Sequence, residues 1–414
     1  PGSGLQDEVD ERLDARLGVR GAEPVLAGLL RGDLAVQGED ERVDDRGLPG
    51  AGRSFEQEDP GRTEPAEVDR VGARRAGKYG RVEFHPPLFA KRLLCGAGGE
   101  CNDRISTGQS SDQLLGGNGD DTLNGGTGFD TLNGGSSADT ADYGDRTGGV
   151  SVNLVSQTGV TGGALNASGF YAGGFTEDRF VSIENAIGSN FGDRLVAGNA
   201  GSRLDGRGGN DNISGQNGDD TLNGGLGLDT LNGGAGVDTA DYSDRTGGVS
   251  VNLFTGSAAT GGALNASGFY AGGSAEDTLA AIESVTGSNF GDRLVTSNAS
   301  GRVEGLGGAD NITGFNGADT LVGGAGNDTL AGGAGADTFV FAAGFGADRI
   351  TDFVEGAGAG DVISLVGLGV TDFAGAIAAA TQSGADVVFN FGGNTITVAN
   401  ATVAGFAADD FVFG

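Results

Sequence analysis

The chain has 414 residues, of which 85 are Gly and 57 are Asp or Glu, and its formal net charge is −32. Such a charge leaves no basic face for a nucleic acid, and a single His disfavours zinc binding and His-based catalysis. No apolar run of about 18 residues occurs, so the sequence predicts no transmembrane helix. The excess of carboxylate oxygens instead favours a hard cation such as Ca²⁺.

The composition changes near residue 104. Residues 1–103 contain all seven Pro and the one His, and they carry a net charge of −6. Their apolar residues are sparse, so we expect this segment to be disordered or non-native. Because the chain begins with Pro1 and contains no Met, we also expect it to be a fragment, or to include a stretch outside the natural reading frame. Cys95 and Cys101 are interpreted as incidental thiols, with a disulfide or a metal pair as alternatives.

A nine-residue repeat begins at residue 107, and its clearest unit is Gly116–Asn124 (GGNGDDTLN). Asp recurs at position six of the unit, and position eight is apolar in every unit. The position-six residues are Asp112, Asp121, Asp130, Asp139, Asp193, Asp211, Asp220, Asp229, Asp238, Asp292, Asp310, Asp319, Asp328 and Asp337. The period therefore encodes a row of candidate ligands together with a row of core residues.

The residue types of the unit predict a turn followed by a short strand. Gly at positions one and four supplies conformations with positive φ and lets the backbone approach an ion closely. One unit cannot bury its own apolar residue, so the units must stack into a β-solenoid. Two units per coil bring residues 18 apart together, so we expect Asp211 to meet Asp229 and Asp220 to meet Asp238. The third block repeats this with Asp310 beside Asp328 and Asp319 beside Asp337.

Stacked carboxylates favour a bound cation over a plain solenoid in which Asp and Gly only form turns. Like charges would otherwise lie close together with nothing to neutralise them. Carboxylates from two coils, together with carbonyl oxygens of the turns, form an oxygen cage of the kind that suits Ca²⁺. The sequence therefore predicts several Ca²⁺ sites between successive turns.

These units resemble the RTX, or haemolysin-type, calcium-binding nonapeptide repeat. The resemblance implies an all-β fold, a right-handed parallel β-roll or β-solenoid with Ca²⁺ between stacked turns. It implies that the position-six Asp residues hold the metal together with the turn glycines Gly116, Gly119, Gly125, Gly128, Gly215, Gly218, Gly224, Gly227, Gly314, Gly317, Gly323 and Gly326. Four units depart from the pattern, and we expect weaker sites there. The unit of Asp112 lacks both glycines, and the units of Asp139, Asp193 and Asp292 have Ser137, Phe191 and Phe290 at position four.

A longer duplication overlies the nonapeptides, because Ala138–Leu154 returns as Val237–Leu253, 99 residues later. This offset is a whole number of units, so we expect the inserts between the blocks to continue the coil with longer loops. Residues 149–154 and 180–187 have the pattern of strands. The loops around Tyr171 and Tyr270 are interpreted as spacers, with contact to a sugar or a partner surface as the alternative.

The organisation predicted from these boundaries has seven parts. They are the segment 1–103, repeat block 1 at 104–142, an insert at 143–187, block 2 at 188–241, the duplicated insert at 242–286, block 3 at 287–341, and a C-terminal cap at 342–414. In the cap we expect strands at 385–391 and 394–398 and a short helical turn at 376–381. The nonapeptides are expected to stop at Ala342.

The C-terminal stretch also resembles the export region of RTX proteins that leave the cell by type I secretion. The resemblance implies a secreted, extracellular protein that meets the type I secretion machinery and folds on Ca²⁺ outside the cell. We expect no catalytic residue, since the chain has neither a G-x-S-x-G elbow nor a two-His zinc helix. Two alternatives stay open. The chain is the export and folding module of a larger secreted protease, lipase or polysaccharide-modifying enzyme, or it is an adhesin that meets cell-surface or extracellular glycans.

Overall fold

The computed structural model describes residues 79–83, 101–161, 175–260, 274–356, 358 and 360–414. Short β-strands make up nearly all of them, and the described residues hold one α-helix, α2 (Phe373–Ala378), and one 3₁₀ turn, η2 (Ala408–Asp410). The chain divides into two compact units, Pro1–Asp139 and Thr140–Gly414. The predicted loops around Tyr171 and Tyr270, and most of the segment before residue 101, lie outside the described residues.

The described residues of the first unit contain five parallel-paired strands. One sheet joins β1 (Tyr79–Glu83), β2 (Asn102–Ser106) and β4 (Thr122–Asn124), and the other joins β3 (Gln113–Asn118) and β5 (Thr131–Ser136). In the registers β2–β4 and β3–β5 each residue faces the one 18 positions later, as two nonapeptides per coil require.

Two features of this unit differ from the sequence predictions. Strand β1 falls within the segment predicted to be disordered, and it pairs in parallel with β2. Cys101 is disulfide-bonded, so the interpretation as an incidental thiol is wrong for this residue. Cys95 lies outside the described residues.

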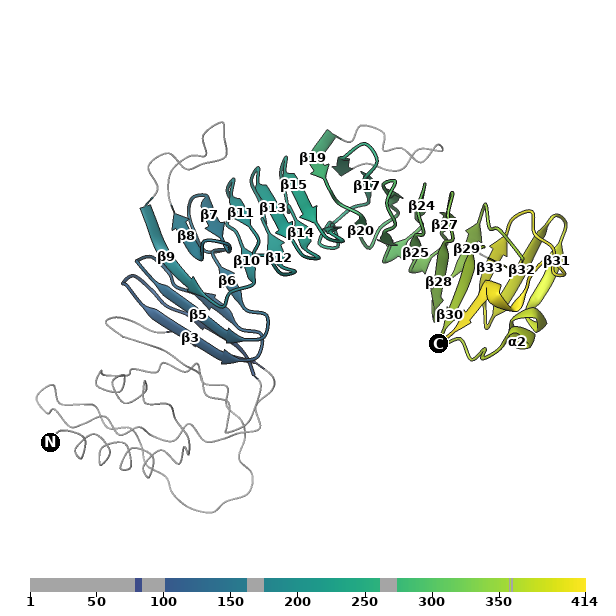
Figure 1. The fold of residues 1–414 in the computed structure, drawn as a ribbon, viewed down its shortest axis with the longest axis horizontal. Coiled ribbons are helices and arrows are strands. Elements are labelled where there is room, and N and C mark those ends of the chain that lie inside the picture. Colours follow the sequence, from purple (N-terminus) through teal and green to yellow (C-terminus); the bar gives the residue numbers. More distant parts are fainter. Residues whose placement is uncertain (1–78, 84–100, 162–174, 261–273, 357, 359) are drawn as a thin grey trace, which may run out of the picture. The chain divides into compact units, whose positions relative to one another are not determined.

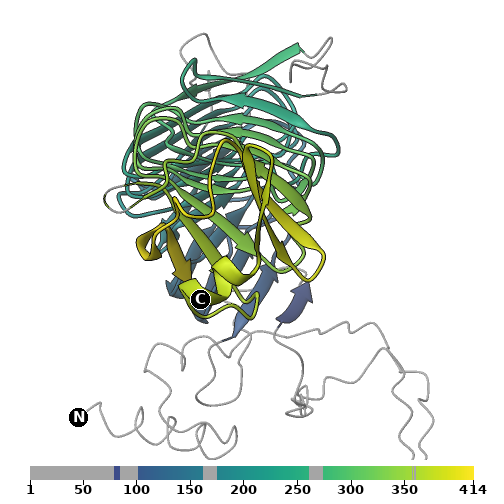
Figure 2. The same cartoon turned by 90° about the vertical axis from the view of Figure 1, so that its right-hand side faces the viewer.

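The second unit has two long sheets in which successive coils stack (Figures 1 and 2). All neighbours in its first sheet are parallel. Its order is β6 (Thr140–Asp142), β10 (Asn185–Ile187), β12 (Arg203–Asp205), β14 (Thr221–Asn223), β16 (Thr239–Asp241), β20 (Ser284–Thr286), β22 (Arg302–Glu304), β25 (Thr320–Val322), β28 (Thr338–Ala342), β30 (Val362–Val366) and β34 (Phe411–Phe413).

The second sheet of this unit is parallel in its repeat blocks and antiparallel in its inserts and cap. Its strands are β7 (Val150–Asn153), β8 (Thr158–Thr161), β9 (Phe175–Val181), β11 (Arg194–Val196), β13 (Asn212–Asn217), β15 (Thr230–Ala235), β17 (Val249–Asn252), β18 (Ser257–Thr260), β19 (Ser274–Ala280), β21 (Arg293–Val295), β24 (Asn311–Thr313), β27 (Thr329–Ala331), β29 (Ala347–Ile350), β31 (Ala380–Ser383), β32 (Asp386–Phe391) and β33 (Asn394–Val398). A small parallel pair, β23 (Gly307–Gly308) and β26 (Ala325–Gly326), joins two turns. The predicted all-β parallel solenoid is confirmed.

The position-eight residues form the core between the two sheets. They are at most 1% exposed, and they stack in register, with Leu204 beside Leu222 in the first sheet and Ile213 beside Leu231 in the second. The residues of this core are Leu114, Leu123, Leu132, Ala141, Leu195, Leu204, Ile213, Leu222, Leu231, Ala240, Leu294, Val303, Ile312, Leu321, Leu330 and Phe339. The predicted core row is therefore confirmed.

An Asn or Asp at position nine closes several turns of the first sheet. Asn223 accepts a hydrogen bond through Oδ1 from the backbone N–H of Gly225 at 2.8 Å, and Asp205 does the same for Arg207 at 2.9 Å. This is the short-range Asx bond that gives Asn and Asp their preference for turns. At these turns the side chain fixes the direction in which the chain leaves the strand.

Each insert adds a three-stranded antiparallel meander to the coil. In the second insert β18 lies between β17 and β19, while β19 pairs in parallel with β15 and β17 with β21 (Figure 1). The stretch 180–187, predicted as one strand, is divided between β9 and β10. The chain turns there at Ser182, which has a φ of 47°.

The C-terminal region, which we predicted to cap the solenoid, begins with a further coil, so the repeats extend further than the sequence suggested. Strand β29 continues the stacking on β27, so the nonapeptides do not stop at Ala342. Strands β33, β32 and β31 follow as an antiparallel meander, and β34 covers β30. The predicted strands match β32 and β33, whereas the helix α2 begins three residues before the predicted turn because Asp372 caps it at the backbone N–H of Gly375.

Shortening a core side chain should destabilise the repeats. We expect Leu222→Ala to lower the free energy of unfolding in saturating Ca²⁺ by about 2–5 kcal/mol, because the solenoid leaves a cavity at this buried position. Leu226→Ala, at a residue that is 73% exposed, should change it by less than about 0.5 kcal/mol. Urea unfolding followed by circular dichroism measures both; equal losses would contradict the core assignment.

Candidate metal centres

The position-six carboxylates link each coil to the next. The backbone N–H of Asp211 donates to Oδ1 of Asp229 at 2.8 Å, and that of Asp220 donates to Oδ1 of Asp238 at 2.9 Å. The third block repeats the bonds at 2.9 Å, from Asp310 to Asp328 and from Asp319 to Asp337. The four pairs predicted to meet therefore do meet. In the first unit Asp103, Asp112 and Asp121 donate in the same way to Asp121, Asp130 and Asp139.

In nine of these carboxylates the second oxygen has no hydrogen-bond partner from the protein. Oδ2 is buried and unpartnered in Asp121, Asp211, Asp220, Asp229, Asp238, Asp310, Asp319, Asp328 and Asp337. A buried carboxylate oxygen without a donor is costly, and each such group in a folded protein calls for an explanation. In the regular units Oδ1 accepts a hydrogen bond from the preceding coil, and Oδ2 points into the turn.

Backbone carbonyls converge on the same points. A Cβ placed on Gly206 would collide with Oδ2 of Asp211 and would lie 2.8 Å from the carbonyl oxygen of Gly224, one coil on. The equivalent space at Gly305 is bounded by Oδ2 of Asp310 and the carbonyl oxygen of Gly323, at 2.5 Å. Position one therefore requires Gly, since a methyl group would occupy the place where carboxylate and carbonyl oxygens face each other.

The glycines of the unit act in two different ways. Those at position one have no positive φ, so close approach alone explains them. Those at position four do have positive φ, such as 101° at Gly218 and 150° at Gly227. Position two also has positive φ, even where the residue is Gln216 or Phe315, at 70° and 71°. Sequence reasoning missed position two because its residue type varies.

Burial shifts the titration of these carboxyls strongly. Desolvation, with a smaller contribution from neighbouring carboxylates, raises the pKa of Asp211 and of Asp310 to about 9, although hydrogen bonds from the backbone lower it. Desolvation likewise raises the pKa of Asp220 and of Asp319 to about 7. Each Asp would release its proton more readily if a positive charge lay beside Oδ2.

The oxygen atoms present suit Ca²⁺. Among the described residues no three His, Cys, Asp or Glu side chains come together as a metal-binding group. A metal in these turns would therefore take carboxylates in pairs and complete its shell with backbone carbonyls. An all-oxygen shell of this kind fits Ca²⁺ and not Zn²⁺.

Two of the predicted site residues differ from the rest. Oδ2 of Asp193 accepts from the backbone N–H of Ser189 at 2.6 Å, and its Oδ1 accepts from Ser189 Oγ at 2.9 Å and from the N–H of Val150 at 2.6 Å. Asp292 has the same partners in Ser288 and Val249. Protein donors already serve both oxygens of these two carboxylates, at the units where weaker sites were expected.

The structure adds one carboxylate that the sequence analysis missed. Oδ1 of Asp348 accepts from the backbone N–H of Asp328 at 2.9 Å, and its Oδ2 is buried and unpartnered. Burial raises the pKa of this carboxyl to about 7. The spacing from Asp328 is 20 residues instead of 18, which hid the unit. The available signal was Gly346 followed by Asp348 and Ile350, which occupy positions four, six and eight.

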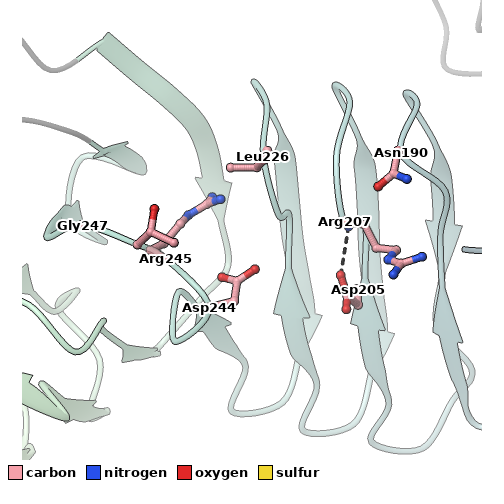
Figure 3. Close-up of a pocket in the computed structure, with 8 residues that line it drawn as sticks. Asn190, Asp205, Arg207, Leu226, Asp244, Arg245 and Gly247 are labelled. Atoms are coloured by element: carbon pink, nitrogen blue, oxygen red, sulfur yellow. Dashed lines mark hydrogen bonds between the residues drawn. The ribbon is translucent and has the colours of Figure 1, made fainter.

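A groove of about 600 Å³ opens beside the turns of block 2 (Figure 3). Its lining residues are Asn190, Asp205, Arg207, Leu226, Asp244, Arg245, Thr246 and Gly247. Both charge signs occur in its wall, and Asp205 bonds the backbone of Arg207. This mixture does not define a ligand, so we assign none.

Comparisons with known proteins agree with the repeat geometry. The family model of the RTX calcium-binding nonapeptide repeat (4 copies) matches residues 115–145, 187–222, 205–240, 295–330, 304–339 and 313–350. A search of curated proteins finds no match. No described helix is long and apolar enough to cross a membrane.

Among solved structures, the extracellular lipase LipA from Serratia marcescens is similar, with 18% sequence identity and a TM-score of 0.29. The match covers 81% of this chain and 42% of the lipase chain, so this chain spans less than half of that protein. The fold assignment above therefore depends on the strand pairing and the repeat, not on this similarity. The chain carries RTX calcium-binding nonapeptide repeats across residues 115–350.

Proposed function

We propose that this protein is a secreted calcium-binding protein whose repeats fold when Ca²⁺ binds between stacked coils. One observation carries the proposal: the row of buried, unpartnered Oδ2 atoms that face backbone carbonyls of the turns. In each turn a position-six Asp would supply carboxylate oxygen, and the Gly-rich turn of the adjacent coil would supply carbonyl oxygen. The ion would add the positive charge that these carboxylates lack.

The charge of the repeats supports a folding switch. Residues 104–414 carry a net charge of −26, and their folded form places carboxylates in neighbouring coils. Without a cation this repulsion and the desolvation of each Asp oppose folding. Extracellular sites of this ligand type bind Ca²⁺ with dissociation constants on the order of 10⁻⁴–10⁻³ M, so folding would follow exit from the cell.

The C-terminal end supports export by the type I secretion machinery before folding. Its acidic and aromatic ending, residues 409–414, resembles the export region of RTX proteins. In the fold this ending is engaged, because β34 pairs with β30 and Asp410 accepts hydrogen bonds from the backbone of Gly356. An exporter would therefore read this segment in the unfolded chain. The loops that we considered for glycan contact lie outside the described residues, and the proposal does not extend to them.

Calcium should control the β content of the chain. Circular dichroism of the full chain is expected to show little β signal in a chelator and a strong β signal in millimolar Ca²⁺, because ion binding offsets the carboxylate repulsion. Mg²⁺ at the same concentration is the control, since it is smaller and gives up its waters reluctantly. Equal β content with and without Ca²⁺ would overturn the proposed function.

Removing the charge of one carboxylate should raise the Ca²⁺ concentration at half-folding only if that carboxylate is at position six of the turn. Asp220→Asn keeps the acceptor for the Ser202 N–H and removes the charge of the buried oxygen, so we expect the Ca²⁺ concentration at half-folding to rise by on the order of tenfold. Asp219→Asn is the matched control. It removes the same charge one residue earlier, from an exposed side chain that keeps its bond to the Val237 N–H. Calorimetric titration compares the two, and equal shifts would assign the effect to net charge alone.

Protons should substitute in part for calcium. The carboxyl pKa values raised in the fold, from about 6 at Asp121 to about 9 at Asp211, mean that the ion-free fold gains stability as pH falls and loses it as pH rises through this range. In a chelator, we expect more β structure at pH 5 than at pH 8.5. With Ca²⁺ present, the concentration at half-folding should fall as pH is lowered from 8 to 6, because protonated carboxyls already stabilise the fold. A midpoint independent of pH would contradict the buried carboxylate geometry.

A further inference from the structure

In the two inserts, the buried carboxylate that joins one coil to the next has different partners from those in the repeats. At the end of block 2 the backbone N–H of Asp229 donates to Oδ1 of Asp277 at 3.0 Å, which is the bond that links regular coils. Asp277 lies 48 residues later instead of 18, and it belongs to β19 of the insert. Asp277 thus takes the place of a position-six Asp.

Its second oxygen has the protein partners that the repeat carboxylates lack. Oδ2 of Asp277 accepts from the hydroxyl of Tyr242 at 2.9 Å, and Nη2 of Arg245 lies 3.8 Å from it. The guanidinium of Arg245 stands 5.4 Å from the centre of the Tyr242 ring. The Arg245 side chain is only 5% exposed, and it belongs to the turn that lines the groove in Figure 3. A permanent positive charge is therefore buried beside this carboxylate.

The first insert repeats the arrangement. The Tyr143 hydroxyl donates to Oδ2 of Asp178 at 2.6 Å, Nη2 of Arg146 lies 3.9 Å from that oxygen, and the guanidinium stands 5.1 Å from the Tyr143 ring. The Arg146 side chain is 7% exposed. Two copies with the same three residues indicate a built feature and not a chance contact.

The geometry brings one positive charge to this junction. Oδ1 of Asp277 accepts from the Asp229 N–H, Oδ2 accepts from the Tyr242 hydroxyl, and the Arg245 guanidinium lies 3.8 Å from that second oxygen.

Local chain contacts favour independent formation of the insert. Strands β17 and β18 form a hairpin whose turn is held by the Asn252 carboxamide, which accepts from the N–H of Thr255 at 3.0 Å. Val249, Val251 and Leu279 are buried within the same segment. These pairings join residues near in sequence, so they need less loop closure than the stacking of distant coils.

We infer that an Arg side chain of each insert, Arg146 or Arg245, supplies the positive charge that Ca²⁺ would supply in the repeats. The junction of Tyr242, Arg245 and Asp277 then forms without Ca²⁺. The inference rests on the proposed function, because it states which coil junctions do not need the ion. In the calcium-free chain the described parts of the two inserts, residues 143–161 with 175–181 and residues 242–260 with 274–280, are then preformed elements onto which the repeats fold when Ca²⁺ arrives.

Hydrogen exchange of the full chain in a chelator and in Ca²⁺ tests this inference. In the chelator, the amides of Ser250–Asn252 in β17 and of Leu279 in β19, which donates to the Gly256 carbonyl within the insert, should exchange at least about tenfold more slowly than those of β13 and β14. In Ca²⁺ both sets should be protected. Equal, fast exchange of both sets in the chelator would overturn the inference while leaving the calcium switch intact. Unchanged protection of β13 and β14 on adding Ca²⁺ would instead overturn the proposed function.

Two variants sharpen the test. Arg245→Gln should abolish the protection of β17 and β19 in the chelator and leave β7 unchanged, since Arg146 still serves the first insert. Arg302→Gln, at an exposed residue that pairs with Glu304 at 3.4 Å, is the matched control and should change neither. Should Arg245→Gln fail to fold in Ca²⁺, Tyr242→Phe removes only the hydroxyl, and it should reduce the same protection. Retained protection in Tyr242→Phe and Arg245→Gln would overturn the inference.

Discussion

The stacking of coils depends on one hydrogen bond, from a backbone N–H to the carboxylate of the Asp one coil later. This bond sets the 18-residue register, since a shift by one residue would leave both the N–H and the buried carboxylate without partners. The same bond brings negative charges from neighbouring coils together in a desolvated turn. The fold and its electrostatic cost therefore have a common origin, and a bound cation is the natural means of offsetting that cost.

The inserts show that this cost can be met in a second way. Where Asp277 replaces a repeat carboxylate, the Tyr242 phenol donates to its second oxygen and the Arg245 guanidinium lies 3.8 Å from it. Where Asp193 replaces one, a serine hydroxyl and backbone N–H groups serve both oxygens. The chain thus contains three environments for one structural role. Among the described carboxylates, those of the regular repeats and Asp348 leave a buried oxygen without a protein partner, so the proposed calcium dependence would lie in these coils.

Much of this architecture could be predicted from the sequence, because two positions of the unit, the Asp at position six and the apolar residue at position eight, show the nine-residue period independently. Leu204 and Val303 kept the apolar phase where the Asp was missing, and both lie in the core. Asp348 escaped because two extra residues precede it, so a search at fixed spacing passes over it. The role of Asp277 escaped for a different reason. Its partners Tyr242 and Arg245 lie 35 and 32 residues away, and only the folded meander brings them together.

The inter-coil bond also has a direction, and this makes the two ends of the solenoid unequal. The earlier coil always donates and the later coil always accepts, so an uncovered N-terminal end presents carboxylates, which water solvates well. An uncovered C-terminal end would present buried N–H groups instead. The chain meets that need with Asp348 and Asp361, which accept from Asp328 and Asp337, and with Asn394, which accepts from Gly346. Coils can therefore be added or lost at the N-terminal side without a dedicated lid, whereas the opposite side requires one.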